Sequence, residues 1–250
     1  MQMVVLTALG IGGATIIGAA IGFCVKNVSH KVNDMILSFA AGIMLAAAVN
    51  GLIAPAFELV SGWKLLIPVL GIFMGALFLN FMDTVTPHLH KLTGTDGEEH
   101  ANNKNLSRAL LFVMAVAIHN LPEGMAAGVS FGNEDVSAAI TVAVGIALQN
   151  VPEGIVTVSP LVMSGVRRSR AFLLAAATGF IEVAGTLLGF FVANLSSAIL
   201  PFALAFAGGT MLYIISDEMI PETHSHGYER SSTYSLLVGF TLMVIMDMVL

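Results

Sequence analysis

The chain has 250 residues, of which 56% are hydrophobic and only 10% are charged, and its net charge is -6. A soluble domain carries roughly 25% charged residues, so this composition excludes an ordinary soluble protein. Nucleic acid is also excluded as a partner, because the sequence has no basic patch of the needed size. The apolar runs are long enough to cross a lipid bilayer, which takes about 20 residues. The sequence therefore predicts an all-α polytopic membrane protein with a single transmembrane domain over residues 1–250, surrounded by lipid.

Apolar segments separated by polar or basic breaks predict a bundle of eight transmembrane helices. In chain order these segments cover approximately residues 4–25, 34–59, 63–83, 107–131, 136–164, 169–193, 199–220 and 233–250. The polar stretch at residues 84–106 is expected to be a loop between the third and fourth helices.

The basic residues predict how the bundle is oriented. Except for Lys64, all of them lie in breaks on one side of the predicted bundle. Arg and Lys gather on the cytoplasmic side of membrane proteins. The loop at 84–106 is therefore predicted to be cytoplasmic and both termini extracytoplasmic. A wrong number of spans would scatter these charges over both sides, so the pattern also supports the eight spans.

A short repeat links the second and seventh spans. Phe-Ala-Ala-Gly-Ile-Met-Leu at residues 39–45 resembles Phe-Ala-Gly-Gly-Thr-Met-Leu at residues 206–212. These two spans cross the membrane in opposite senses, as the halves of an inverted repeat do. The predicted arrangement is 3+2+3, in which the first three spans match the last three around a central pair.

The central pair carries nearly the same six residues twice: His-Asn-Leu-Pro-Glu-Gly at 119–124 and Gln-Asn-Val-Pro-Glu-Gly at 149–154. Proline inside a helix removes one backbone hydrogen bond and clashes with the carbonyl four residues earlier. Each helix is therefore expected to be broken at its proline, and in lipid the freed carbonyl must find a partner or face a cavity. An ordinary kink is the simpler interpretation, but a glutamate follows each proline.

Residues four apart share one face of a helix, so His119 lies beside Glu123, and Gln149 lies beside Glu153. If the two helices pack together, they present two carboxylates, one imidazole and three amides: Glu123, Glu153, His119, Gln149, Asn120 and Asn150. A charged group inside the bilayer costs roughly 2.5–3.5 kcal/mol on insertion scales, and no Lys or Arg lies near either motif. A bound cation is the natural partner of these carboxylates.

Charge and ligand type predict which cation. Neutral His119 with ionised Glu123 and Glu153 carries a charge of -2, which one divalent ion neutralises. Imidazole with carboxylate suits zinc, iron or manganese, whereas calcium prefers oxygen alone and copper(I) prefers sulfur. A structural polar cluster and a proton relay are the alternative interpretations.

The paired motifs resemble those of the ZIP family of metal transporters, and the Gln149 form is similar to its GufA branch. The similarity covers nearly the whole chain, at residues 39–45, 83–90, 118–130, 149–154 and 218–224. It implies eight spans, both termini outside and a metal centre between the fourth and fifth spans. It also implies membrane transport of divalent ions toward the cytoplasm, with zinc preferred over iron, manganese or cadmium.

The resemblance implies a primary metal site with five candidate ligands: His119, Glu123, Gln149, Glu153 and Met44. It implies an adjoining second site that shares both glutamates and adds Asn120, Asn150 and Glu182. Some relatives of the GufA type have Asp where this chain has Asn150. The loss of that charge leaves -3 for two divalent ions, so the second site is expected to bind weakly. A transient metal stop and a proton acceptor are alternative roles for Glu182.

Further polar residues lie near the predicted cytoplasmic side. His88, His90 and His100 fall in the predicted loop, where histidines can collect metal or simply be solvated. An exit relay or a solvated helix end is predicted for five residues near the end of the seventh span: Asp217, Glu218, Glu222, His224 and His226.

An inverted repeat fits a carrier with alternating access, and a channel with the same ligands is the other transport mechanism left open. The alternative from another class is an intramembrane zinc metalloenzyme. The His-Glu-x-x-His string of such enzymes is absent from the sequence, so no enzymatic activity is expected. A metal sensor is not favoured, because it would need an attached soluble output domain. Whether the protein forms a homodimer is left open.

Overall fold

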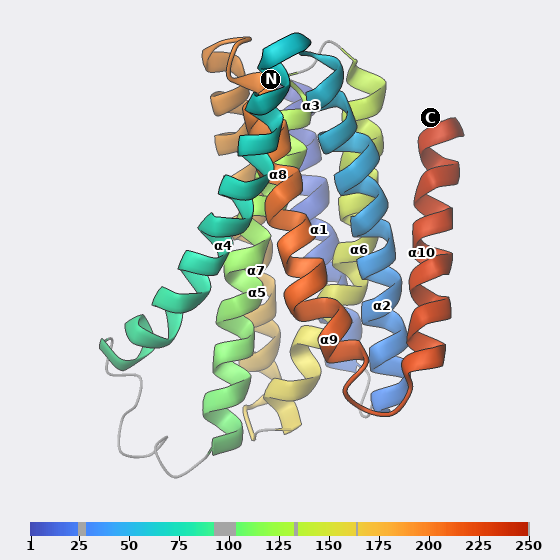
Figure 1. The fold of residues 1–250 in the computed structure, drawn as a ribbon. Coiled ribbons are helices and arrows are strands. Elements are labelled where there is room, and N and C mark those ends of the chain that lie inside the picture. Colours follow the sequence, from blue (N-terminus) through green and yellow to red (C-terminus); the bar gives the residue numbers. More distant parts are fainter. Residues whose placement is uncertain (25–28, 93–103, 133–134, 164, 250) are drawn as a thin grey trace.

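The computed structural model describes residues 1–24, 29–92, 104–132, 135–163 and 165–249. Over these residues the chain forms a helical bundle, with both termini toward the same end (Figure 1). The long helices are α1 (Gln2–Cys24), α2 (His30–Ala46), α4 (Leu66–Leu92), α5 (Lys104–Ser130), α6 (Val136–Met163), α7 (Arg168–Leu195), α8 (Leu200–Ile214) and α10 (Glu229–Val249). The short ones are α3 (Ala54–Glu58), α9 (Ile220–Thr223) and a 3₁₀ turn at Gly62–Leu65.

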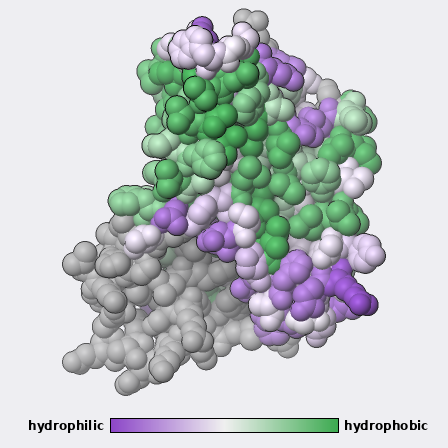
Figure 2. All heavy atoms as spheres, in the orientation of Figure 1, coloured by the Kyte–Doolittle hydropathy of each residue, from purple (hydrophilic) through white to green (hydrophobic). Residues whose placement is uncertain are grey.

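The helices have the length and surface that a bilayer requires. Seven helical spans among the described residues are long and apolar enough to cross a membrane. The 27-residue helix α5 packs against α7 inside the same bundle, and at 1.5 Å per residue such a helix is about 40 Å long. Figure 2 shows apolar side chains over the middle of the visible face, with polar residues toward its ends. The chain is a multi-pass membrane protein with a helical bundle fold, as predicted.

The helix packing has a matching pattern in the two halves of the chain. α5 packs on α7 as α6 packs on α1, and α4 packs on α8 as α10 packs on α2. Figure 1 shows α4 and α10 at opposite edges of the bundle. A Cβ on Gly42 would lie 2.0 Å from the Leu236 carbonyl oxygen, and one on Gly209 would lie 2.2 Å from that of Ile72. The 3+2+3 inverted repeat would pair the helices in this way, and the repeat itself stays a prediction.

Two helices leave the α-helical repeat at corresponding places. α2 continues into a π-helical segment at Ala47–Ile53, and α8 continues into one at Ile215–Met219. Each segment is followed by a short α-helix with a proline in its first turn, Pro55 in α3 and Pro221 in α9. Such π-helical turns occur frequently at functional sites.

The predicted breaks at the two motif prolines are wrong, because α5 and α6 continue through Pro122 and Pro152 without interruption. A proline removes one bond of the ladder, and the neighbouring bonds keep each helix intact. The predicted loop at 84–106 is also too long, since α4 extends to Leu92 and α5 begins at Lys104. His88 and His90 lie on the last turns of α4, and His100 lies outside the described residues.

Candidate metal centre

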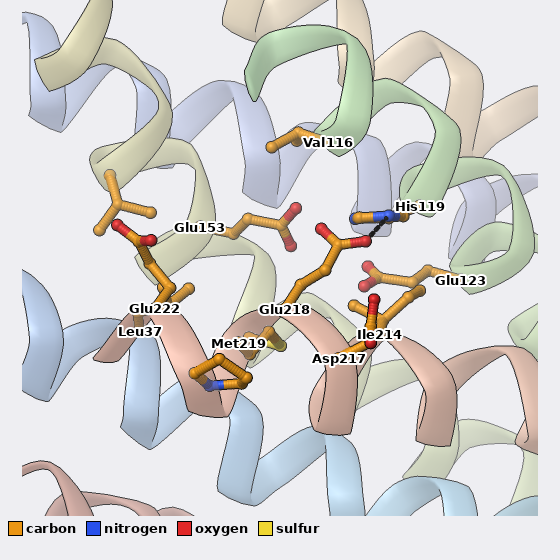
Figure 3. Close-up of a pocket in the computed structure, with 12 residues that line it drawn as sticks. Leu37, Val116, His119, Glu123, Glu153, Ile214, Asp217, Glu218, Met219 and Glu222 are labelled. Atoms are coloured by element: carbon orange, nitrogen blue, oxygen red, sulfur yellow. Dashed lines mark ion pairs between the residues drawn. The ribbon is translucent and has the colours of Figure 1, made fainter. Parts of the chain in front are cut away.

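α5 and α6 meet at a cavity of about 380 Å³, which we call the metal-centre cavity. His119 and Glu123 of α5 and Glu153 of α6 line it. All three side chains are at least nine-tenths buried, although each is a polar or charged group inside the bilayer. The four-residue spacing of His119 and Glu123 puts both on one helical face, as predicted, and Glu153 approaches from the neighbouring helix (Figure 3).

The opposite wall of the cavity is formed by the polar end of α8. Asp217 and Glu218 lie in its π-helical segment, and Glu222 follows in α9. The Glu218 carboxylate reaches across the cavity to His119, with 2.7 Å between Oε1 and Nε2. In Figure 3 it lies between Glu153, His119 and Glu123. The cavity therefore brings four acidic or imidazole side chains close together, from helices far apart in the sequence.

Within the part of the chain that the structure describes, no three His, Cys, Asp or Glu side chains converge closely enough to hold a metal ion. The contact between Glu218 and His119 explains part of this arrangement, because it occupies an imidazole nitrogen that a metal would need. The observed centre is thus an imidazole–carboxylate pair beside two further carboxylates.

Two other predicted ligands are buried but do not line the cavity. Gln149 is 1% exposed on α6, one turn before Glu153. Met44 is fully buried in α2 and belongs to the main apolar core. Leu37 and Ile214, which belong to the same core, line the metal-centre cavity.

The residues of the predicted second site form a separate group, which we call the Glu182 cluster: Thr15, Asn120, Asn150 and Glu182. Glu182 of α7 is fully buried. Its carboxylate accepts hydrogen bonds from the Asn120 amide, from the Asn150 amide at 2.7 Å and from the Thr15 hydroxyl, which lies 2.7 and 2.9 Å from its two oxygens. Four helices, α1, α5, α6 and α7, therefore meet at one carboxylate.

The glycines of the two motifs allow these helices to approach. A Cβ on Gly124 of α5 would lie 2.2 Å from the Glu182 carbonyl oxygen of α7. A Cβ on Gly154 of α6 would lie 2.4 Å from the Thr15 carbonyl oxygen of α1. Small residues at helix contacts let backbones pack closely in membranes. In each motif the glutamate is therefore followed by the residue that packs its helix against an outer one.

A third polar group lies near the starts of α2 and α10. Asp34 of α2 is 1% exposed, and its Oδ1 lies 3.1 Å from Nδ1 of His226. The ring of His30 stacks on that of His226, with 4.7 Å between the centroids. Leu37, one turn after Asp34 on the same helix, lines the metal-centre cavity.

The structure separates the predicted site residues into groups that the sequence could not distinguish. His119, Glu123 and Glu153 meet at the cavity, while Asn120, Asn150 and Glu182 meet one another. Thr15 was missed, because a single threonine in an apolar helix gives no signal of its own. The direct contact of Glu218 with His119 was also missed, since the two residues are far apart in the sequence. The metal-collecting role of His88 and His90 stays a prediction.

Together, the bundle and its buried acidic centre define a multi-pass membrane protein built around an intramembrane polar site. A family model described as "ZIP Zinc transporter" matches residues 90–247. The zinc transporter GufA of Myxococcus xanthus is 41% identical over 95% of this chain and 94% of its own length. The zinc transporter ZIPB of Bordetella bronchiseptica is 37% identical over 94% of this chain and 77% of its own length. A zinc transporter ZupT, from Chlorobaculum parvum, is 33% identical over 94% of this chain and 92% of its own length.

The chain belongs to the ZIP zinc transporter family. The resemblance stated from the two motifs is thereby confirmed, including the GufA branch.

Proposed function

We propose that this protein carries zinc across the membrane, toward the side on which Lys31 and Arg167 lie, through the metal-centre cavity. The single observation that carries the proposal is the meeting of His119, Glu123 and Glu153 at one buried cavity between α5 and α6. Two carboxylates and one imidazole are the donor types that zinc prefers. The names of the relatives agree with this substrate.

Charge gives the binding step its driving force. Glu123 and Glu153 are buried in the span, and a charged group is costly there. One divalent ion neutralises the charges of both carboxylates when His119 is neutral. The carboxylates also replace part of the water that the ion loses when it binds. Gln149 and Met44 are the further ligands that we assign to this site, as the resemblance to the family implies, and both side chains are buried.

Glu218 gives the release step a chemical basis. Zinc and Glu218 compete for the same nitrogen of His119, because that nitrogen is already in contact with Oε1 of Glu218. When the metal leaves, the imidazole and Glu218 pair with each other. Asp217 and Glu222 continue the acidic lining beyond Glu218 and offer the departing ion its next oxygen ligands. Since metal ligands bind in their deprotonated form, binding and release also exchange protons.

We infer that the protein is a carrier and has no enzymatic activity. A metalloprotease would need a general base held over metal-bound water, usually within His-Glu-x-x-His. Here the acidic groups continue from the centre along one cavity, which favours passage of an ion over a reaction at one point. Iron, manganese and cadmium remain competing substrates, because each accepts imidazole and carboxylate ligands.

Metal flux into proteoliposomes tests this function. The purified full-length protein is reconstituted and offered Zn²⁺, Fe²⁺, Mn²⁺ or Cd²⁺ in turn, while internal metal and internal pH are both recorded. We expect saturable zinc entry with a pH change that follows it, and less entry of the other ions. If zinc enters no faster than in protein-free liposomes, the proposal is wrong.

A further inference from the structure

We propose that the amides of Asn150 and Asn120, with the hydroxyl of Thr15, fill the place beside Glu182 that a second metal ion would need. The protein then binds a single ion, and the Glu182 cluster serves as a fixed joint between four helices. The single-ion part of this inference rests on the proposed function, because it assumes that zinc binds at the first centre. The joint itself depends only on the contacts of Glu182.

The first argument is the number of donors around Glu182. A carboxylate offers about four lone-pair positions on its two oxygens. Oε1 is reached by Asn120 and Thr15, and Oε2 by Asn150 and Thr15. All three donors are neutral, and Glu182 is fully buried. The single Thr15 proton is shared between the two oxygens, so three donor groups reach both oxygens of the carboxylate without a cation.

The second argument is the direction of the amides. Asn120 and Asn150 both turn their Nδ2 groups toward Glu182. An amide nitrogen has two protons and no free electron pair for a metal, so only Oδ1 could be a ligand. The Oδ1 atoms of both residues are buried and have no hydrogen-bond partner among the described residues. A metal ion bound to the oxygens of Glu182 would have to displace the two amide nitrogens that occupy them, and the carboxylate would lose two of its donors.

The third argument is the packing around the joint. Thr15 is in α1 and Glu182 is in α7, and these helices touch closely one turn earlier, where Gly12 meets Gly179. A Cβ on Gly12 would lie 2.4 Å from the Gly179 carbonyl oxygen. The Asn150 amide also lies 3.4 Å from the Ile11 carbonyl oxygen of α1. Since the backbones cannot come nearer, the side chains of the Glu182 cluster are held in fixed positions.

Asn150 is the residue that determines this behaviour. An aspartate there has the same shape but two acceptor oxygens in place of the donor. Two carboxylates facing each other in a buried site repel, unless a cation lies between them. Asn150→Asp should therefore turn a hydrogen-bonded joint into a second metal site.

The number of bound ions tests the proposal. Full-length protein in detergent is dialysed against Zn²⁺ alone, and bound metal per chain is measured by elemental analysis. We expect one ion in the wild type, one in Glu182→Gln and two in Asn150→Asp. Asn194→Asp is the matched control, since Asn194 is exposed on α7 and, among the described residues, bonds only the Phe190 carbonyl of its own helix. Two ions in the wild type with one in Glu182→Gln, or one ion in Asn150→Asp, would overturn the proposal.

Thermal unfolding of the metal-free protein in a chelator tests the joint by itself. We expect Thr15→Val and Asn150→Asp to lower the midpoint by several degrees, with Thr15→Ser close to wild type and zinc restoring only Asn150→Asp. Thr178→Val is the control, because within the described part of the chain that buried hydroxyl bonds only the Ala175 carbonyl of its own helix. A midpoint for Thr15→Val equal to that of Thr178→Val would refute the joint. If the wild type binds no zinc at all, the proposed function fails and this measurement still decides the joint.

Discussion

The buried carboxylates on α5 and α6 and the buried carboxylate of Glu182 on α7 have different surroundings. Glu123 and Glu153 line a cavity, and their neighbours in it are one imidazole and more carboxylates. Glu182 has no contact with open space and accepts hydrogen bonds from three neutral donors. Burial of a carboxylate alone therefore does not identify an ion site. A carboxylate beside a cavity can exchange its partner, whereas one that is enclosed by amides holds helices together.

The largest loss of transport is expected when a carboxylate is removed from the cavity. Glu123→Ala or Glu153→Ala should lower zinc uptake by more than about 100-fold, since even residues that only support metal ligands are worth about 10–100-fold. Uptake into proteoliposomes measures the effect. Glu229→Ala is the control, because Glu229 is exposed in the first turn of α10. Uptake like that of the wild type in both cavity variants would show that the ion takes another path.

The packing of the two motifs can be broken separately from their charge. Gly124→Ala and Gly154→Ala would each place a Cβ within 2.4 Å of a neighbouring carbonyl oxygen, and overpacking costs about 1–3 kcal/mol. Thermal unfolding in detergent should show both variants clearly destabilised. Gly10→Ala is the control, since nothing lies within 4 Å of its added Cβ. Equal stability of all three variants would mean that these helix contacts are looser than described.

Removing the Glu218 side chain frees the His119 imidazole for zinc without changing α5 or α6. Glu218→Ala should tighten zinc binding and slow zinc release, each by about tenfold, the equivalent of one charged hydrogen bond. Zinc titration and uptake kinetics measure the two effects. Ser216→Ala is the control, since its hydroxyl bonds the Leu212 carbonyl of its own helix. Weaker zinc binding in Glu218→Ala would make Glu218 a ligand and not a competitor.

The smallest effect is expected at the end of α4. Replacing both His88 and His90 by alanine should change uptake by no more than about threefold, since histidines outside the span collect metal without forming the centre. The same uptake assay applies, with zinc at a concentration below saturation. Complete loss of uptake would move the essential site to this end of the molecule.

The helical class, the spans and the three cavity residues on α5 and α6 could be predicted from the sequence. Hydropathy sets where a helix crosses lipid, and a four-residue spacing sets which side chains share its face, so His119 and Glu123 follow from local information. Glu153 follows as well, because its motif repeats that of Glu123. These rules act within one helix or between matching helices.

The remaining contacts depend on packing between distant segments. No spacing rule relates Glu218 to His119 or Thr15 to Glu182, because their approach depends on how α8 and α1 lie in the bundle. The end of α4 was predicted as a loop because its residues are polar, but a helix needs no apolar face once it has left the bilayer. The prolines were predicted to break the two helices, but each proline removes only one hydrogen bond and the neighbouring bonds keep the helix intact.

The π-helical segment in α8 also has a mechanical meaning. An α-helix turns by about 100° and rises about 1.5 Å for each residue. A segment with one surplus residue can pass that residue to the adjoining turn, and the chain beyond it then rotates by about that angle while the apolar half stays seated on α4. Glu218 lies inside this segment and Glu222 just beyond it. One end of this helix can thus stay packed against its neighbour while the other end rotates and changes the direction of its acidic side chains.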